Sequence, residues 1–149
     1  MEVAGSWADP LYAGRPVPDP DALSAEYWAA ARAGELRYQE CPDCGHRQFY
    51  PRLLCTACGA TPGWKAASGR GTVHTFTVVR KNLAPPFDRL TPYVVAVVEL
   101  AEGPRMMGNV THCDPDQVRI GDAVTAYAVA VDDGVAAPFW RPAADGGGA

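Results

Sequence analysis

The stretches CPDCG at residues 41–45 and CTACG at residues 55–59 hold four of the five cysteines of the chain. Each Cys-x-x-Cys-Gly unit is typical of a tight knuckle, because glycine permits a positive φ and backbone amides can then donate to the thiolates. Ten residues separate the two units' facing cysteines, a spacing that indicates a short hairpin bringing the knuckles together. The sequence therefore predicts a metal site whose ligands are Cys41, Cys44, Cys55 and Cys58.

Zinc is the predicted occupant of this site, because four thiolates complete the tetrahedral shell that zinc prefers in structural sites. No protein position is left open for substrate or water, so the site is predicted to be structural and not catalytic. Iron in a rubredoxin-like site uses the same ligands, which keeps an electron carrier as an alternative. His46 follows the first knuckle, but no fifth ligand is needed. A ribbon of this size is expected to fold only with its metal.

Composition is typical of a globular protein, with 149 residues, of which 48% are hydrophobic and 20% charged. This length predicts one compact unit, or two small ones that share a core. No run of 18 apolar residues is present, so no membrane-spanning helix is expected. Glu2 and Asp9 lie where a basic, apolar leader would be, so we expect no secretory signal and a cytoplasmic location. Paired cysteines in such a chain favour a metal over disulfides.

Charge is distributed unevenly along the chain. Residues 1–35 hold two basic and six acidic side chains, residues 36–66 hold four and two, and residues 69–142 hold seven and eight. Nucleic-acid binding depends mainly on neutralising phosphates, and only the small cysteine-containing ribbon has a basic excess. The charge distribution therefore argues against a nucleic-acid partner.

The N-terminal third is expected to contain an arm and a helix. Residues 1–18 are rich in Pro and Gly, which indicates an extended arm lying on the chain's own body or on a partner, or else a disordered tail. Residues 20–33 are predicted to be helical, with Asp19 as the N-cap and Gly34 as the stop. Leu23, Tyr27 and Ala30 or Ala31 share one face beside Trp28; this face covers the core or, as an alternative, meets a partner.

From Gly69 onward the pattern of apolar residues changes to period two, which is typical of strands. The predicted strands are separated by turn residues and cover Thr72–Val79, Tyr93–Leu100, Arg105–Thr111, Ala123–Val131 and a shorter Pro138–Arg141. Five short strands without a long helix indicate a small closed barrel, because closure removes exposed sheet edges. The predicted organisation is an arm and helix over 1–35, a ribbon over 36–67, a barrel over 68–142 and a disordered tail over 143–149.

The order of these features resembles the DUF35 family, in which a rubredoxin-like zinc ribbon precedes an OB-fold barrel. The resemblance covers about Tyr27 to Pro142, most of the chain. Beyond the cysteines, the matching residues are Tyr27-Trp28, Gly34-Glu35-Leu36, Gln39, Pro51-Arg52, Trp64, Ser68-Gly69-Arg70-Gly71, Pro92-Tyr93, Glu102-Gly103, Arg105, Gly108-Asn109 and Gly121-Asp122. The implied fold class is mainly β: an N-terminal helix, a four-cysteine zinc ribbon and a five-stranded OB-fold barrel.

The resemblance implies an accessory subunit of an acyl-CoA enzyme. Family members pair with thiolase-superfamily proteins, which include thiolases and lipid-transfer-protein-like aldolases. In some steroid side-chain degradation systems the module works beside a MaoC-like enoyl-CoA hydratase. No hotdog domain is expected here, so the chain is a stand-alone subunit or a module of a larger protein. The implied function is complex assembly and acyl-CoA binding.

Several residues are candidates for contacting a ligand or partner. The loop that contains Arg80, Lys81 and Phe87 combines two cations, a diproline and an aromatic ring, and could close over a pantetheine arm or the partner's active-site mouth. A solvated hairpin loop is the alternative. Arg105 and Asn109 on the third predicted strand could face a ligand. Tyr27 and Trp28 complete the set of candidates.

Catalysis by this chain alone is not expected. His112-Cys113 is the only adjacent Cys–His pair outside the ribbon, and neighbouring residues of a strand point to opposite faces. Gly-x-Ser-x-Gly, phosphate-loop and His-Glu-x-x-His motifs are absent from the sequence. The alternative functions are an electron carrier and a single-strand nucleic-acid binder, since OB barrels bind strands through basic grooves and stacking aromatics. Phe76, Tyr93 and Tyr127 supply aromatics for such binding, but few cations lie near them in the sequence.

Overall fold

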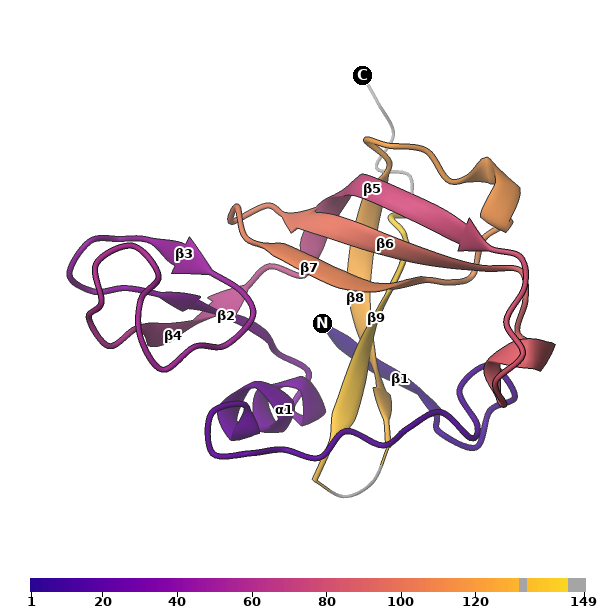
Figure 1. Ribbon diagram of the computed structural model, residues 1–149, viewed down its shortest axis with the longest axis horizontal. Helices are drawn as coiled ribbons and strands as arrows, with labels where there is room; N and C mark the ends of the chain where they lie inside the picture. The colour runs from indigo at the N-terminus through magenta and orange to yellow at the C-terminus, as the bar shows by residue number, and fades with distance from the viewer. Residues whose placement is uncertain (132–133, 145–149) are drawn as a thin grey trace.

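The structure is a computed structural model that describes residues 1–131 and 134–144. It contains a small three-stranded ribbon at one end, a six-stranded sheet curled into a barrel at the other, and one α-helix below the junction (Figure 1). The helices are α1 (Ala25–Arg32) and two 3-10 turns, η1 (Phe87–Arg89) and η2 (Pro115–Gln117). No helix of the described ranges is long and apolar enough to cross a membrane.

The ribbon is an antiparallel sheet with the order β3-β2-β4. Its central strand β2 (Leu36–Glu40) pairs along its full length with β4 (Gly63–Ala67) and at two positions with the short β3 (Arg47–Gln48). Leu36 and Tyr38 on β2 are buried toward the barrel, while Gln39 is buried within the ribbon. This sheet fixes the start and end of the segment that carries the cysteines.

The barrel is closed, which confirms the mainly β fold with a five-stranded barrel. The sheet has the order β1-β8-β5-β6-β7-β9, and an additional pairing of β8 with β9 closes a ring of five strands, β8, β5, β6, β7 and β9. β1 is a sixth strand that pairs with β8. The strands of the sheet are β1 (Glu2–Ser6), β5 (Arg70–Val79), β6 (Tyr93–Leu100), β7 (Arg105–Val110), β8 (Ala123–Ala130) and β9 (Ala136–Pro142). Alternate residues of β6 are buried, as period two requires. The last strand is longer than the predicted Pro138–Arg141, because β9 pairs with β8 along its whole length.

Gly71 is required where β5 passes between its two neighbours. It pairs with Leu100 of β6 on one side and with Val124 of β8 on the other. A Cβ atom at this position would lie 2.5 Å from Val98 Cγ1 and 2.8 Å from the Glu99 carbonyl oxygen. The close crossing of strands in a small barrel therefore leaves room only for glycine.

The helix begins at Ala25, five residues later than predicted, and the assignment of Asp19 as its N-cap is wrong. Asp21 and Ser24 form a local turn instead: the Ser24 amide donates to Asp21 Oδ1 at 2.8 Å, and the Ala25 amide donates to the Asp21 carbonyl oxygen at 2.8 Å. Since the Asp21 amide also donates to Ser24 Oγ at 3.2 Å, Asp21 and Ser24 have the reciprocal bonds of a capping box at the start of the helix. Tyr27, Ala30 and Ala31 are buried against the barrel and β2, while Leu23 lies outside the helix and is 37% exposed.

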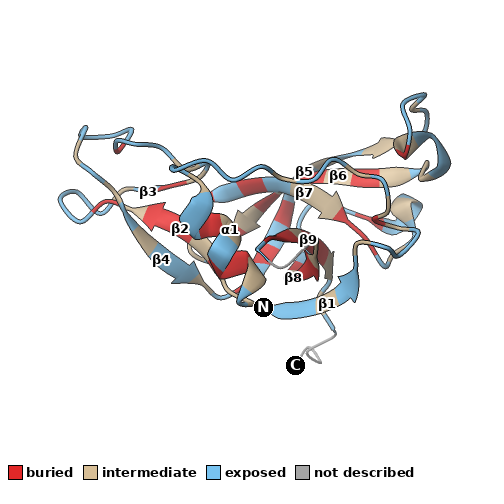
Figure 2. Ribbon diagram, turned by 90° about the horizontal axis from the view of Figure 1, so that it is seen from below, coloured by how far each residue is buried: buried red, intermediate tan, exposed pale blue. Residues whose placement is uncertain are grey.

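The N-terminal arm lies on the chain's own barrel. β1 pairs in parallel with β8, and the Trp7 amide then donates to the Ala130 carbonyl oxygen at 3.1 Å. Tyr12 is 3% exposed and packs on Phe139, with 4.9 Å between ring centroids. The arm thereby covers a second, smaller apolar cluster next to the main core. Figure 2 shows the buried residues running along the barrel strands and continuing into α1 and β2.

A short seam joins the ribbon to the barrel, because only Ser68 and Gly69 separate β4 from β5. The Ser68 amide donates to Glu102 Oε1 at 2.8 Å, and the Gly69 carbonyl oxygen accepts from the Ala126 amide at 2.7 Å. Arg47 of the ribbon donates to the Glu102 carbonyl oxygen at 3.0 Å. The orientation of the ribbon is therefore set by contacts on both sides of the joint.

At the C-terminal end, the predicted disordered tail covers residues 143–149. The Ala143 amide donates to the Ala123 carbonyl oxygen at 3.0 Å, so the first residue of the predicted tail is hydrogen-bonded to the barrel. Residues 145–149 of that prediction lie outside the described residues.

Candidate metal centre

Two turns of the same shape present the four cysteines. In the first, the Cys41 amide donates to the His46 carbonyl oxygen at 2.8 Å and the Gly45 amide donates to the Cys41 carbonyl oxygen at 2.9 Å. The second repeats this pattern, with Cys55 bonded to Ala60 at 2.7 Å and Gly59 bonded to Cys55 at 2.9 Å. Gly45 and Gly59 have φ values of 72° and 79°, as the knuckle interpretation of the motif requires.

The cysteine sulfur atoms form one cluster. All four lie within 4.8 Å of one another, with Cys41 and Cys58 3.5 Å apart and Cys44 and Cys55 3.7 Å apart. Zinc–sulfur bonds of about 2.3 Å in a regular tetrahedron place neighbouring sulfur atoms about 3.8 Å apart. Cys41 and Cys55 are buried and Cys44 and Cys58 are exposed. The cluster therefore has the donor set and the dimensions of a four-thiolate metal site.

The thiols do not ionise equally. Burial raises the pKa of Cys55, but the backbone amides of Cys58 and Ala57 outweigh this effect and lower the pKa to about 6. The Ala60 amide lowers the pKa of Cys58, but the close Cys44 and Cys41 thiols and burial outweigh it and raise the pKa to about 12. Four sulfur atoms this close need a divalent cation to stabilise them all as thiolates.

Two buried glutamines support the loop between the knuckles, and the sequence reasoning assigned them no structural role. Gln48 Nε2 donates to Gln39 Oε1 at 2.8 Å, and Gln39 also accepts from the Arg52 amide at 2.8 Å and donates to the Arg52 carbonyl oxygen at 3.0 Å. Gln48 Oε1 accepts from the Thr56 amide at 2.9 Å. The side-chain amides of these two glutamines thus satisfy backbone groups of the loop that no strand pairs with. Gln39 and Gln48 face each other across β2 and β3, and this placement was the signal that could have predicted their role.

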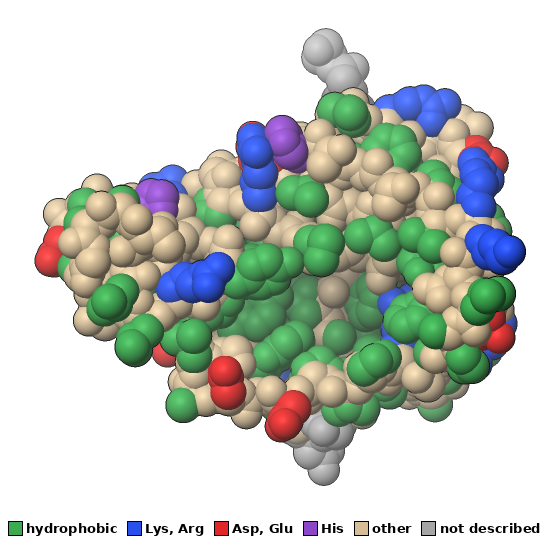
Figure 3. Space-filling view, viewed as in Figure 1, with side chains coloured by type: hydrophobic (Ala, Val, Ile, Leu, Met, Phe, Trp, Pro, Cys, Tyr) green, Lys and Arg blue, Asp and Glu red, His purple; other side chains and the backbone are tan. Residues whose placement is uncertain are grey.

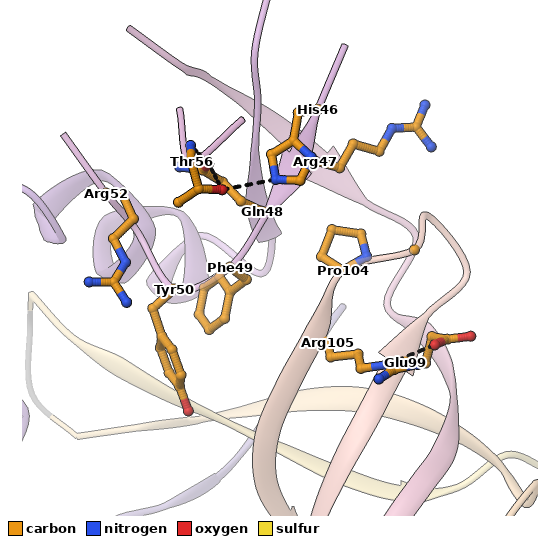
Figure 4. Close-up of a pocket in the computed structure, with 11 residues that line it drawn as sticks. His46, Arg47, Gln48, Phe49, Tyr50, Arg52, Thr56, Glu99, Pro104 and Arg105 are labelled. Atoms are coloured by element: carbon orange, nitrogen blue, oxygen red, sulfur yellow. Dashed lines mark hydrogen bonds and ion pairs between the residues drawn. The ribbon is translucent and has the colours of Figure 1, made fainter. Parts of the chain in front are cut away.

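A polar groove lies between the ribbon and the β6–β7 turn, with a volume of about 430 Å³ (Figure 4). It contains Arg105, one of the predicted contact residues, which forms an ion pair with Glu99 at 2.9 Å. Arg47 and Arg52 line the ribbon side, and Phe49 and Tyr50 lie at the edge. Figure 4 shows the Arg47 guanidinium directed away from the aromatic pair. The groove has a cationic rim with one internal carboxylate.

An apolar pocket of about 420 Å³ lies beside the groove, and the predicted residues Tyr27 and Trp28 line it. Its other walls come from the segment before the helix, from the ribbon loop and from the barrel strands β7 and β9: Asp19, Ser24, Phe49, Tyr50, Pro51, Met107, Ala137 and Pro138. Figure 3 shows hydrophobic side chains gathered around a hollow on this face of the molecule. Met107 also belongs to an exposed apolar strip on β5 and β6 that includes Phe76.

The remaining predicted contact residues lie at the far end of the barrel, away from Arg105 and the helix. Arg80 forms an ion pair with Asp116, and Lys81 is exposed. Phe87 and Phe139 flank the Arg15 guanidinium, 5.4 and 5.3 Å from the two ring centroids, and Arg15 donates to Asn109 at 2.8 Å. The structure thus divides the candidates into three groups: the helix pair, Arg105 in the polar groove, and the far-end residues.

His112 and Cys113 line one small pocket of about 100 Å³, which corrects the argument from strand alternation. β7 ends at Val110, and His112 then has a φ of 57°, so the chain turns at this point. The His112 ring is hydrogen-bonded to Thr111 Oγ1 at 3.0 Å. Burial and the nearby Asp114 and Asp122 raise the pKa of Cys113, which is the opposite of what an activated nucleophile needs.

Comparisons with known proteins match both parts of the chain. One family model, described as the rubredoxin-like zinc ribbon domain of ChsH2, matches residues 28–62, and another, the C-terminal OB-fold domain of ChsH2, matches residues 64–129. A DUF35 domain-containing scaffold protein of Methanothermobacter thermautotrophicus is 39% identical over 92 residues, which cover 60% of this chain and 68% of the relative. The chain belongs to the DUF35 family.

A solved structure extends this DUF35 assignment over nearly the whole fold. The Ltp2-ChsH2(DUF35) aldolase contains a chain with a TM-score of 0.75 and 31% identity, and the match covers 85% of this chain and 98% of that one. Another relative is the 3-oxo-4,17-pregnadiene-20-carboxyl-CoA hydratase alpha subunit of Mycobacterium tuberculosis, 35% identical over 123 residues. That match covers 77% of this chain and 39% of the hydratase subunit.

Proposed function

We propose that this DUF35 chain is a non-catalytic accessory subunit that assembles with a thiolase-superfamily acyl-CoA enzyme, a thiolase or a lipid-transfer-protein-like aldolase. The observation that carries the proposal is the match, over 85% of this chain, to a chain of the Ltp2-ChsH2(DUF35) aldolase. The relatives called scaffold proteins support a role in assembly. We place this role in the cytoplasm, where reduced thiols persist.

We also propose that the cysteine cluster holds zinc as a structural ion. Sulfur separations of 3.5 and 3.7 Å fit a zinc tetrahedron, and the match to a rubredoxin-like zinc ribbon supports the assignment. The ion would join the two knuckles and thereby hold the loop that carries Phe49 and Tyr50. No chemistry on substrate is assigned to it, because all four positions of the shell come from cysteine.

The acyl-CoA part of the proposal has a narrower version, in which the substrate is a steroid side-chain thioester. It is supported by the name of the mycobacterial hydratase subunit, of which the chain spans about two fifths. A MaoC-like hydratase is accordingly a second candidate partner.

Co-purification with a thiolase-like protein from the same organism tests the proposal. Tagged chain and untagged partner are co-expressed, and complex mass and acyl-CoA turnover are measured with and without the chain. We expect a stable complex whose turnover or solubility depends on it. Absence of a complex, together with single-strand DNA binding at moderate salt, would favour the OB-fold nucleic-acid alternative.

Two exposed leucines map the partner surface in the same experiment. Leu83 lies in the loop that carries Arg80 and Phe87 and is 80% exposed, while Leu53 on the ribbon is 73% exposed. If the loop meets the partner, Leu83→Asp weakens the complex at least tenfold, since burying an unpaired charge is costly. Leu53→Asp is the matched control, and a loss with that variant alone would move the interface to the ribbon.

A further inference from the structure

The N-terminal arm places one arginine, Arg15, against the far end of the barrel. Arg15 Nε donates to the Leu11 carbonyl oxygen at 3.2 Å, and Nη1 donates to Asn109 Oδ1 at 2.8 Å. The guanidinium carbon also lies over the Phe87 and Phe139 rings, 5.4 and 5.3 Å from their centroids. Among the described residues, no Asp or Glu pairs with Arg15. The described contacts of this cation are therefore all with neutral groups.

The Arg15 side chain is half-buried, so the charge of its guanidinium is only partly compensated. Burial lowers the pKa of Arg15, and the Tyr93 phenol, first among the neighbours that raise it, offsets this effect only in part. Aromatic faces stabilise a cation, but they leave its in-plane N–H groups able to donate. Water can satisfy those N–H groups without neutralising the charge, and arginines that leave water are usually paired with an anion.

An anion can reach Arg15 through the small pocket of about 100 Å³ beyond the end of β7. Arg15, Asn109 and Tyr93 line this pocket, and no Asp or Glu is among the described residues of its walls. The Tyr93 hydroxyl accepts from Asn82 Nδ2 at 3.0 Å, and its own proton has no acceptor among the described residues. The walls therefore combine one cation with a hydroxyl that can still donate.

The size and the walls of this pocket restrict the class of ligand. Small-molecule sites span about 300–1,000 Å³, so a space of about 100 Å³ holds only a few non-hydrogen atoms. A planar guanidinium matches the two oxygen atoms of a carboxylate better than it matches a spherical ion. Apolar residues supply much of the remaining wall and can contact a short hydrocarbon tail: Leu11, Leu90, Pro92, Val94, Val110 and Pro115.

We propose that this pocket binds a free monocarboxylate of two or three carbon atoms. The carboxylate pairs with the Arg15 guanidinium and accepts from the Tyr93 hydroxyl, while the short tail lies against Leu90 and Pro92. Acetate is the simplest ligand of this class. Its binding would join the arm to the loop before β6. The site goes beyond the proposed role in assembly and does not depend on it, because these residues all belong to the chain itself.

The test compares acetate with acetamide, which have the same shape and differ in charge. Each compound is titrated at constant ionic strength into the full-length, ¹⁵N-labelled chain, and Kd is taken from the Arg15 Nε–H signal and from the backbone amide signals of Asn109 and Thr111. We expect saturable shifts with acetate and none with acetamide. Arg15→Gln removes the charge and should weaken acetate binding about tenfold or more, because charge-assisted hydrogen bonds are stronger than neutral ones.

Three further variants complete the design. Leu90→Trp fills the pocket from the loop and leaves Arg15 in place, so it should abolish acetate binding even if Arg15→Gln disturbs the arm. Tyr93→Phe removes the second donor and should weaken acetate about two- to fivefold. Arg80→Gln is the matched control, because it removes an exposed cation at the same end of the barrel that pairs with Asp116, and the acetate Kd should not change.

The proposal is overturned if acetate gives no saturable shifts or if acetamide binds equally well. An unchanged acetate Kd in Arg15→Gln or in Leu90→Trp would also overturn it. Equal weakening by Arg80→Gln and Arg15→Gln would do the same, because it would show diffuse attraction of anions to this end of the barrel and no defined site.

Discussion

At the scale of single residues, Glu102 joins the ribbon to the barrel through the Ser68 amide. Burial raises its pKa, but the Ser68 amide and hydroxyl outweigh burial and lower it below the ordinary 4.5. A lowered pKa contributes stability above the ordinary value, and that stability is lost as the pH falls through the lower, folded-state value. We therefore predict that Glu102→Gln lowers the free energy of unfolding by about 1 kcal/mol at pH 7, and that the difference from the unmodified chain shrinks as the pH falls below the ordinary 4.5. Urea titrations at pH 7 and in that lower range measure it. Glu99→Gln, which affects only an exposed ion pair, is the matched control and should change little at either pH; an equal loss in both variants would contradict a special role for the seam.

At the scale of elements, the arm functions as a part of the barrel, since Tyr12 fills the small apolar cluster over Tyr127 and Phe139. Its hydroxyl is hydrogen-bonded to the Tyr127 hydroxyl at 2.7 Å. Truncating a buried aromatic ring costs about 3–5 kcal/mol, so Tyr12→Ala should lower the free energy of unfolding by that amount. Urea denaturation followed by far-UV circular dichroism gives the value. Tyr50→Ala, which removes a half-exposed ring, should cost much less, and a small effect of Tyr12→Ala would mean that the arm leaves the barrel in solution.

At the scale of the whole molecule, the four-cysteine cluster allows one ion to join the two knuckles of the ribbon. We predict one zinc per chain by mass spectrometry of the purified protein. Cys55→Ser should lose the metal and greatly reduce the yield of soluble protein, because the folding of a small metal ribbon depends on its ion. Cys113→Ser, which alters the cysteine outside the cluster, should keep one zinc and a normal yield. Iron in place of zinc would support the electron-carrier alternative, and a folded, metal-free Cys55→Ser chain would show that the ion is dispensable.

Local patterns in the sequence predicted what local chemistry decides. The knuckles follow from glycine and cysteine spacing alone, and the β6 strand follows from strict alternation over Tyr93–Leu100. The cysteines were predicted to converge, and their sulfur atoms do lie within 4.8 Å of one another. The closed barrel could be predicted because the sequence has four clear strand patterns and a shorter fifth, and closing the sheet pairs the backbone groups of its edge strands.

Other features depend on partners far away in the sequence. The arm pairs with β8 more than 100 positions later, so its place could not be deduced from residues 1–18. The start of α1 was misplaced because Asp21, two residues after the predicted cap Asp19, makes the reciprocal capping bonds with Ser24. His112 takes a positive φ in a segment that has the composition of a strand, which brings Cys113 to the same pocket. The apolar pocket draws on α1, a ribbon loop, β7 and β9, so periodicity within one element gives no sign of it.

Because only two residues separate β4 from β5, the ribbon and the barrel are expected to move together as one rigid unit. A protein that binds the ribbon would therefore also fix the orientation of the barrel and of its hollow face. A single attachment can thus set the position and the three rotations of the entire subunit. The bonds of Glu102 to Ser68 and Arg47, and the packing of Leu36 and Tyr38 in the barrel core, would oppose any change in that orientation.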